Sequence, residues 1–195
     1  MIGLVFLGAL LASMWLLPQA HAGNVVGFLV SEPGQPYKLK VQDSAAAMTI
    51  EAGEWVVTTL KHLRDGSLIV GTGHVSHEQK TVHLDSVQTV GLTELLGTWQ
   101  SSRWEVFEFR DFNSLMRYLP MENSRGSLEL KFVESYDYVL TPDNQDTYSI
   151  FITDNSKRMM VGTLHLSAGS VILTVYDSET GRESEKISLS PLSLK

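Results

Sequence analysis

Histidines gather in one short segment, HVSHEQKTVH (74–83), which contains three of them and a glutamate. Zinc takes three or four ligands at about 2 Å, and imidazole and carboxylate groups are common among them. On an extended strand His74 and His77 point to opposite faces, so a metal site requires a turn over 76–79. The spacing matches no recognised ligand pattern. We therefore predict solvated turn and strand histidines, with no metal bound.

Carboxylates gather in YDYVLTPDNQD (136–146), where Asp137, Asp143 and Asp146 are candidates for acid–base chemistry. Hydrolysis by paired carboxylates needs an acid opposite a base, and no second element is evident to supply one. The chain has no cysteine, no G-x-S-x-G segment, no phosphate loop and no H-E-x-x-H. A Ser/His/Asp triad needs no proximity in sequence, so a hydrolase stays open as an alternative. We predict a non-enzymatic protein with no catalytic residue and no cofactor.

Aromatic side chains on predicted strands are the remaining candidates for binding. They suit a ligand cavity or a protein-binding face, and the simplest alternative for most of them is the core. The residues that we predict as ligand-binding are Trp55, Trp104, Tyr118 and Tyr148.

Nearly every segment after residue 22 is typical of a β-strand, being rich in Val, Ile, Thr and aromatic residues between turn residues such as Asp65-Gly66 and Ala168-Gly169. The segment 112–119 fits either a short helix or a strand that continues past a bend. The spacing predicts an all-β fold, an antiparallel meander that forms a small barrel or sandwich. The predicted strands are 24–31, 37–43, 54–60, 67–76, 81–87, 95–101, 103–112, 127–141, 147–153, 158–167 and 170–178.

Alternation assigns faces within some of these strands. Leu128, Leu130 and Phe132 share one face, and the charged residues between them point the other way. The segment RWEVFEF (103–109) has large apolar side chains on both faces, which indicates a strand that is buried on both sides or interrupted by a bulge.

Two pairs of segments are separated by the same distance in the chain. LKVQDS (39–44) resembles LKFVES (130–135), and VGTGHVS (70–76) resembles VGTLHLS (161–167), with 130 − 39 = 161 − 70 = 91. Two copies of one β-unit would explain the equal offsets, with the first copy shorter by 102–122. Chance likeness among strands of similar composition is the alternative.

Gly97-Thr98-Trp99 leads into the aromatic strand and the meander that follows it. This arrangement resembles the first motif of the lipocalins and related calycin-type barrels, and the resemblance covers about 91–191. It implies a small barrel in which Gly97 and Trp99 are structural, with the tryptophan packed across the barrel end. In lipocalins the motif lies near the mature N-terminus, whereas about 70 residues precede it here, and later lipocalin motifs are absent.

The N-terminal segment IGLVFLGALLASMWLL (2–17) carries no charge and is followed by Ala20-His21-Ala22, as in a signal peptide over 1–22. A retained anchor is the alternative, because roughly 16 apolar residues approach the length that spans a bilayer. No later apolar stretch is long enough to cross a membrane. We therefore expect a periplasmic or secreted protein.

The net charge of −7 and the scattered basic residues exclude nucleic acid as a partner, since such surfaces need a basic patch. We predict an N-terminal β-unit over 23–90 and a lipocalin-like β-unit over 91–195. The predicted function is that of an exported accessory or binding protein that engages an envelope protein partner through a β-rich surface. A carrier of a small apolar ligand is the alternative.

Overall fold

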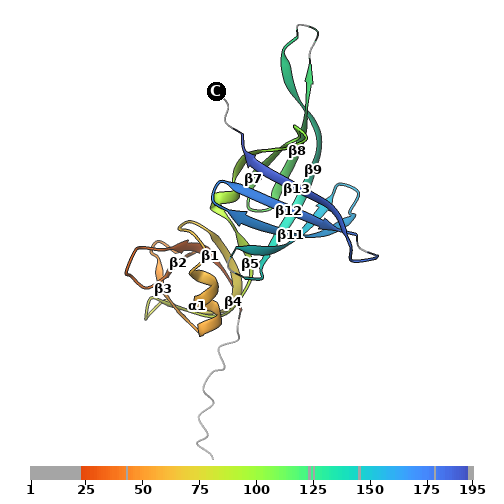
Figure 1. Cartoon of the computed structure of the whole chain (residues 1–195). Helices are drawn as coiled ribbons and strands as arrows, with labels where there is room; N and C mark the ends of the chain where they lie inside the picture. The colour runs from red at the N-terminus through yellow and green to blue at the C-terminus, as the bar shows by residue number, and fades with distance from the viewer. Residues whose placement is uncertain are drawn as a thin grey trace, which may run out of the picture.

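The computed structural model describes residues 23–42, 44–122, 124, 126–144, 146–177 and 179–192. The predicted signal peptide, 1–22, lies outside the described residues. The strands form one continuous sheet that closes on itself twice, giving two barrels side by side (Figure 1).

The first barrel has five strands and one helix. These are β1 (Gly23–Val30), β2 (Lys38–Val41), β3 (Met48–Ala52), α1 (Glu54–Leu60), β4 (Leu68–Ser76) and β5 (Thr81–Gly91). β1 pairs with β2 and β4, β2 pairs with β3, and β4 pairs with β5, all antiparallel. A parallel pairing of β3 with β5 completes the barrel. OB folds use this kind of five-stranded barrel.

The prediction of a strand over 54–60 is wrong, because this segment is the helix α1. Val56 and Leu60, four residues apart, are both buried and belong to the core of the molecule. In a seven-residue segment rich in Val and Thr, helical and extended patterns are hard to distinguish, and burial of this one face decides the outcome. Strand β3 was not predicted either.

The second barrel has eight strands, preceded by the short 3₁₀ helix η1 (Thr93–Leu95). Each strand pairs antiparallel with the next, and β13 pairs with β6, which closes the barrel. The predicted all-β antiparallel meander is thus confirmed, and within 112–119 a turn at 112–113 is followed by strand β8 from Ser114 onward. The strands are β6 (Gly97–Ser101), β7 (Val106–Asp111), β8 (Ser114–Glu122), β9 (Leu128–Pro142), β10 (Thr147–Asp154), β11 (Met159–Ser167), β12 (Ser170–Tyr176) and β13 (Glu183–Pro191).

Large side chains fill the second barrel. Tyr138, Tyr148 and Phe109 are the largest of the fully buried residues, and the rings of Phe109 and Tyr138 meet edge to face at 5.4 Å between centroids. Val106 and Phe107, which point to opposite faces of β7, are both buried, and a bulge follows Phe109. The two alternatives predicted for RWEVFEF (103–109), burial on both faces and a bulge, are therefore both confirmed.

The repeat hypothesis is wrong, because the two barrels differ in connectivity. In the first barrel, β2 and β4 flank β1, which precedes both of them in the chain. In the second barrel, β9 and β11 flank β10, which lies between them in the chain. The first barrel also has a parallel pair and a helix, whereas the second is a simple meander. The sequence likeness reflects strands of similar composition.

The two barrels are joined at a small junction. Val90 of β5 pairs with Leu140 of β9, which makes the sheet continuous. Phe112, in the turn between β7 and β8, packs against Phe28 of the first barrel with 6.0 Å between ring centroids. A Cβ atom on Gly91 would lie 2.4 Å from a carbon of the Phe112 ring, so only glycine fits there.

Candidate functional site

Strands β8 and β9 continue beyond the barrel wall as a two-stranded arm, which projects from the side of the second barrel away from the first (Figure 1). Tyr118 is the last residue of β8 that pairs with β7, and β9 pairs with β10 only from Tyr136 onward. We define the arm as residues 118–122 of β8 and 128–135 of β9. Apart from the pairing of Tyr118 with Val106 of β7, none of the described strands pairs with the outer edges of this ribbon.

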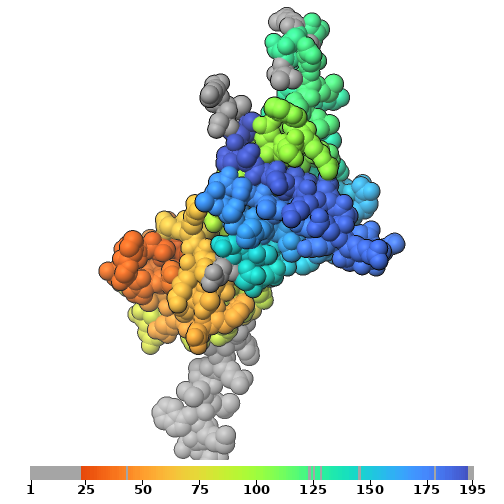
Figure 2. Space-filling model, viewed as in Figure 1, coloured from red at the N-terminus to blue at the C-terminus, as the bar shows by residue number. Residues whose placement is uncertain are grey.

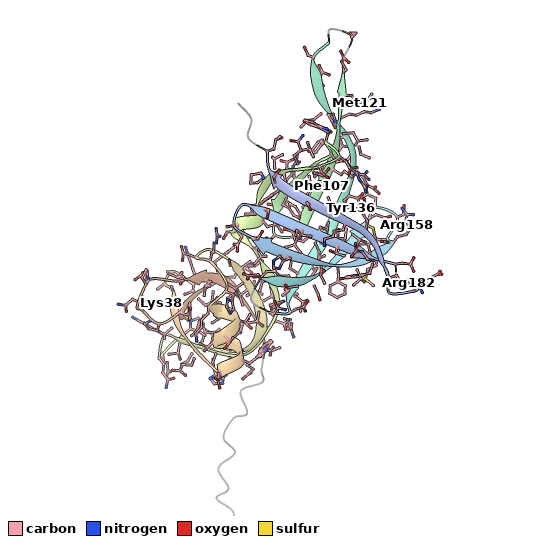
Figure 3. All side chains as sticks on the ribbon, viewed as in Figure 1. Lys38, Phe107, Met121, Tyr136, Arg158 and Arg182 are labelled. Carbon is pink, nitrogen blue, oxygen red and sulfur yellow. The ribbon has the colours of Figure 1, made fainter. Side chains whose placement is uncertain are left out.

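The arm exposes large apolar side chains on both of its faces. The pairings of Tyr118 with Phe132 and of Pro120 with Leu130 place these four residues on one face. Met121 and Leu119 lie on the other face. Figure 2 shows the arm standing clear of the body, and Met121 is labelled on it in Figure 3. The exposed fractions are 38% for Leu119, 49% for Met121, 48% for Leu130, 48% for Phe132 and 42% for Val133.

Local sequence explains the shape of the arm. A bulge between Arg117 and Tyr118 leaves Val133 opposite no residue of β8 and turns the ribbon away from the barrel. Pro120 has no N–H to offer a third strand, so the edge formed by β8 is a poor site for further pairing. The edge formed by β9 has no such obstacle. Of the predicted shared face, the Leu128 side chain lies outside the described ones. Leu130 and Phe132 share a face as predicted, but this face is exposed to solvent.

A polar network fixes the root of the arm on the barrel. The Tyr118 hydroxyl donates to Glu108 Oε2 at 2.7 Å and accepts from Arg110 Nη2 at 3.1 Å. Burial and the bond to Glu108 raise the pKa of Tyr118. Its ring also meets Phe132 at 6.0 Å between centroids. These contacts hold the first pair of arm residues in a defined orientation relative to the barrel.

The interior of the second barrel has little free space. A hollow of about 80 Å³ remains at one end, lined by apolar side chains that include Phe107 and Tyr136 (Figure 3) and by the ion pair of Glu105 with Arg117. Sites for small molecules usually have about 300–1,000 Å³. The hollow is therefore too small for most lipophilic ligands.

The four aromatic residues predicted to bind a ligand lie in three different places. Trp55, on α1, is 58% exposed and shares a pocket with Tyr148 of β10, at the boundary between the barrels. Tyr118 lies at the root of the arm. Trp104 is 68% exposed in the turn before β7, where its φ is +68°. The structure thus brings together Trp55 and Tyr148 only.

The residues predicted to be structural lie where the second barrel begins. Gly97 opens β6 with φ of +123°, a conformation that favours glycine. Trp99 is 7% exposed, and its indole N–H donates to the carbonyl of Leu95 in η1 at 2.8 Å.

The histidine segment forms a hairpin with a turn after Ser76, as expected for HVSHEQKTVH. His74 and His83 face each other across β4 and β5, with their rings stacked at 5.0 Å between centroids. His83 also lies 3.4 Å from Asp85. Over the described part of the chain, no three His, Asp or Glu side chains are grouped as metal ligands would be.

Sequence reasoning missed the arm as a surface. Alternating apolar and charged residues over 127–134 are equally typical of a strand with one buried face, so the pattern gave no sign of exposure. One signal was available. The predicted strand at 127–141 is long for a barrel of this size, and excess strand length must project beyond the wall.

Comparisons with known proteins give no family for this chain. No protein-family model matches it, and no curated protein is significantly similar to it in sequence. None of the helices in the described residues is long and apolar enough to pass through a bilayer.

Proposed function

We propose that this chain is an exported, non-enzymatic accessory protein that binds a protein partner through the arm of the second barrel. The observation that carries the proposal is the group of half-exposed apolar side chains on a ribbon that extends beyond the barrel. Contiguous apolar surface of this kind marks interaction sites in soluble proteins. A two-stranded hairpin is also marginally stable by itself, so a partner that covers it would stabilise it.

The partner contributes a β-strand in this proposal. The edge of β9 over 128–135 continues the line along which β10 pairs farther down the same strand. β10 ends at Asp154, opposite Tyr136. An added strand would therefore pair with β9 beyond this point, in line with β10. Main-chain hydrogen bonds would supply affinity, and the apolar side chains of the arm would supply specificity.

The lipocalin-like character of the second barrel is part of the proposal. Its support is a 3₁₀ turn, then Gly97 and buried Trp99 in the first strand of a closed eight-stranded meander. A carrier function has less support, because the free space inside this barrel is small. The barrel serves instead as a rigid base for the arm.

The test is site-specific photo-crosslinking in cells that export the protein. A photoreactive residue at Phe132 is compared with one at Val139, which is 45% exposed on the same strand but lies within the barrel wall. We expect a discrete crosslinked protein from position 132 and none from position 139. Leu130→Glu combined with Met121→Glu should abolish the crosslink, and Val139→Glu should leave it intact.

Each variant is first checked for folding by its thermal unfolding. Substitutions of half-exposed side chains usually change the free energy of unfolding by less than about 0.5 kcal/mol. Identical crosslinks from positions 132 and 139 would contradict the proposal. A crosslinked dimer, with a concentration-dependent mass in light scattering, would identify a second copy of the chain as the occupant instead.

A further inference from the structure

A second candidate site lies between the two barrels, separate from the arm. A cleft of about 800 Å³ is lined by His62 and Arg64, which follow α1, by Glu94 of η1, and by Tyr148 and the β11–β12 turn of the second barrel. A smaller pocket of about 210 Å³ shares His62 and Tyr148 with this cleft and adds Trp55. The combined space is sufficient for a small organic molecule.

Tyr148 presents a polar atom to this space. The residue is 1% exposed, yet its hydroxyl makes no hydrogen bond to any described residue. Of the side-chain N and O atoms in the described residues that are fully shielded from solvent, only Ser67 Oγ lacks a hydrogen-bond partner. The Tyr148 hydroxyl also lacks a partner, so it is not fully shielded and keeps access to the cleft. Buried hydroxyls normally have a partner, and one that faces a cleft is available to a ligand.

The charges around this hydroxyl are mainly negative. Glu94 and Asp146 line the cleft. Burial, assisted by the negative charges of these two carboxylates, raises the pKa of Tyr148 to about 12. Among the described lining residues, Arg64 is the only Lys or Arg; its side chain is 71% exposed, and its Nε lies 3.9 Å from Glu94. Solvent screens the charge of this exposed guanidinium, and the lining sets two carboxylates, Glu94 and Asp146, against it.

The neighbouring pocket adds features that suit a cation. Trp55 presents an indole that is 58% exposed, and Asp143 lines the same pocket. Asp143 already accepts a bond from Ser149 Oγ at 2.7 Å, which orients its carboxylate. An aromatic face beside carboxylates attracts organic cations, whereas anions are repelled.

We propose that this cleft binds a small organic cation that carries a protonated amine. The ammonium group donates to the Tyr148 hydroxyl and to the carboxylates of Glu94 and Asp146. The aliphatic part of the ligand lies toward Trp55. An ammonium has three donors and no acceptor, which matches a site built of acceptors.

The experiment is titration calorimetry of the folded protein with three four-carbon probes of matched length. Putrescine carries two ammonium groups, 1,4-butanediol is neutral, and succinate carries two carboxylates. We expect saturable binding of putrescine only, weakened by added salt. Glu94→Gln should weaken it by about tenfold or more, and Trp55→Ala by a few-fold. Glu78→Gln, an exposed position outside both pockets, is the matched control and should have no effect.

Thermal unfolding shows whether each variant remains folded, and Asp146→Asn, at an exposed position, replaces Glu94→Gln if that variant does not. The proposal is overturned if putrescine shows no saturation up to about 20 mM. It is also overturned if putrescine binds the Glu94 or Asp146 variant as well as the wild type, or if succinate or butanediol binds more tightly.

Discussion

At the scale of single residues, the two tryptophans near the start of the second barrel have opposite environments. Trp99 is buried with its indole N–H bonded to the carbonyl of Leu95, whereas Trp104, five residues later, is 68% exposed in a turn. The pattern Gly-x-Trp suggested the role of Trp99. Nothing in the local sequence indicated that the next tryptophan lies outside, because both precede strand residues.

The substitution Trp99→Ala should lower the free energy of unfolding by about 3–5 kcal/mol, since it removes a large buried side chain and leaves a cavity. Trp99→Phe should cost less, but should still lose the hydrogen bond to Leu95, worth about 1 kcal/mol. Denaturant unfolding measures both. Trp104→Ala is the control and should change stability by no more than about 0.5 kcal/mol. Equal losses for the two alanine variants would contradict a structural role for Trp99.

At the scale of elements, the turn between β10 and β11 depends on one carboxylate. Asp154 Oδ1 accepts from the backbone N–H groups of Ser156 and Arg158 at 2.8 and 2.9 Å, and Oδ2 accepts from Arg158 Nε at 2.7 Å. These bonds favour the ionised form and hold the pKa of Asp154 below its usual range. Lys157 in the same turn has φ of +64°, so the turn is held in an otherwise uncommon conformation.

This turn predicts a pH dependence of stability. The pKa of Asp154 is lower in the folded state, so its stabilising effect is fully present above the ordinary value of 3.8 and is lost as the pH falls through the folded value. Asp154→Asn should therefore lower the melting temperature at pH 7, and this deficit should shrink below about pH 3. Asp137→Asn, an exposed position on β9, is the control. A deficit that stays constant across this range would contradict the assignment.

Much of the second barrel could be predicted from the sequence, because Val, Ile and aromatic residues alternate between clear turn signals. The elements that were missed lack that contrast. In β13, only Ile187 and Leu189 mark the inner face among polar residues, and β3 is short. The parallel pairing of β3 with β5 depends on contacts distant in sequence, which alternation within one strand does not specify.

The candidate surfaces were less predictable than the fold. Trp55 and Tyr148 were selected as aromatic residues, but their meeting in one pocket depends on how two barrels are placed. The helix that carries Trp55 was expected to be a strand. The arm has the predicted alternation of apolar and charged residues. It is exposed because β8 and β9 extend beyond the ends of β7 and β10, the strands that flank them.

At the scale of the whole molecule, strand β9 links the arm, the junction between the barrels and the pocket of Trp55. Its first half forms the arm, Leu140 near its end pairs with Val90 of the first barrel, and Pro142 lines the pocket of Trp55. The arrangement of the barrels therefore sets the shape of the cleft. The contact of Phe112 with Gly91 and Phe28 is part of what fixes this arrangement.

Gly91→Ala should loosen the junction, because its new Cβ would lie 2.4–2.6 Å from Cδ1, Cγ and Cβ of Phe112. Overpacking of this kind typically costs about 1–3 kcal/mol. We expect faster hydrogen exchange at 88–92 and 110–114 and easier proteolysis between the barrels, with the strands of each barrel still protected. Gly53→Ala, where a Cβ meets nothing within 4 Å, is the control. If Gly91→Ala leaves exchange at the junction unchanged, then this contact does not hold the two barrels together.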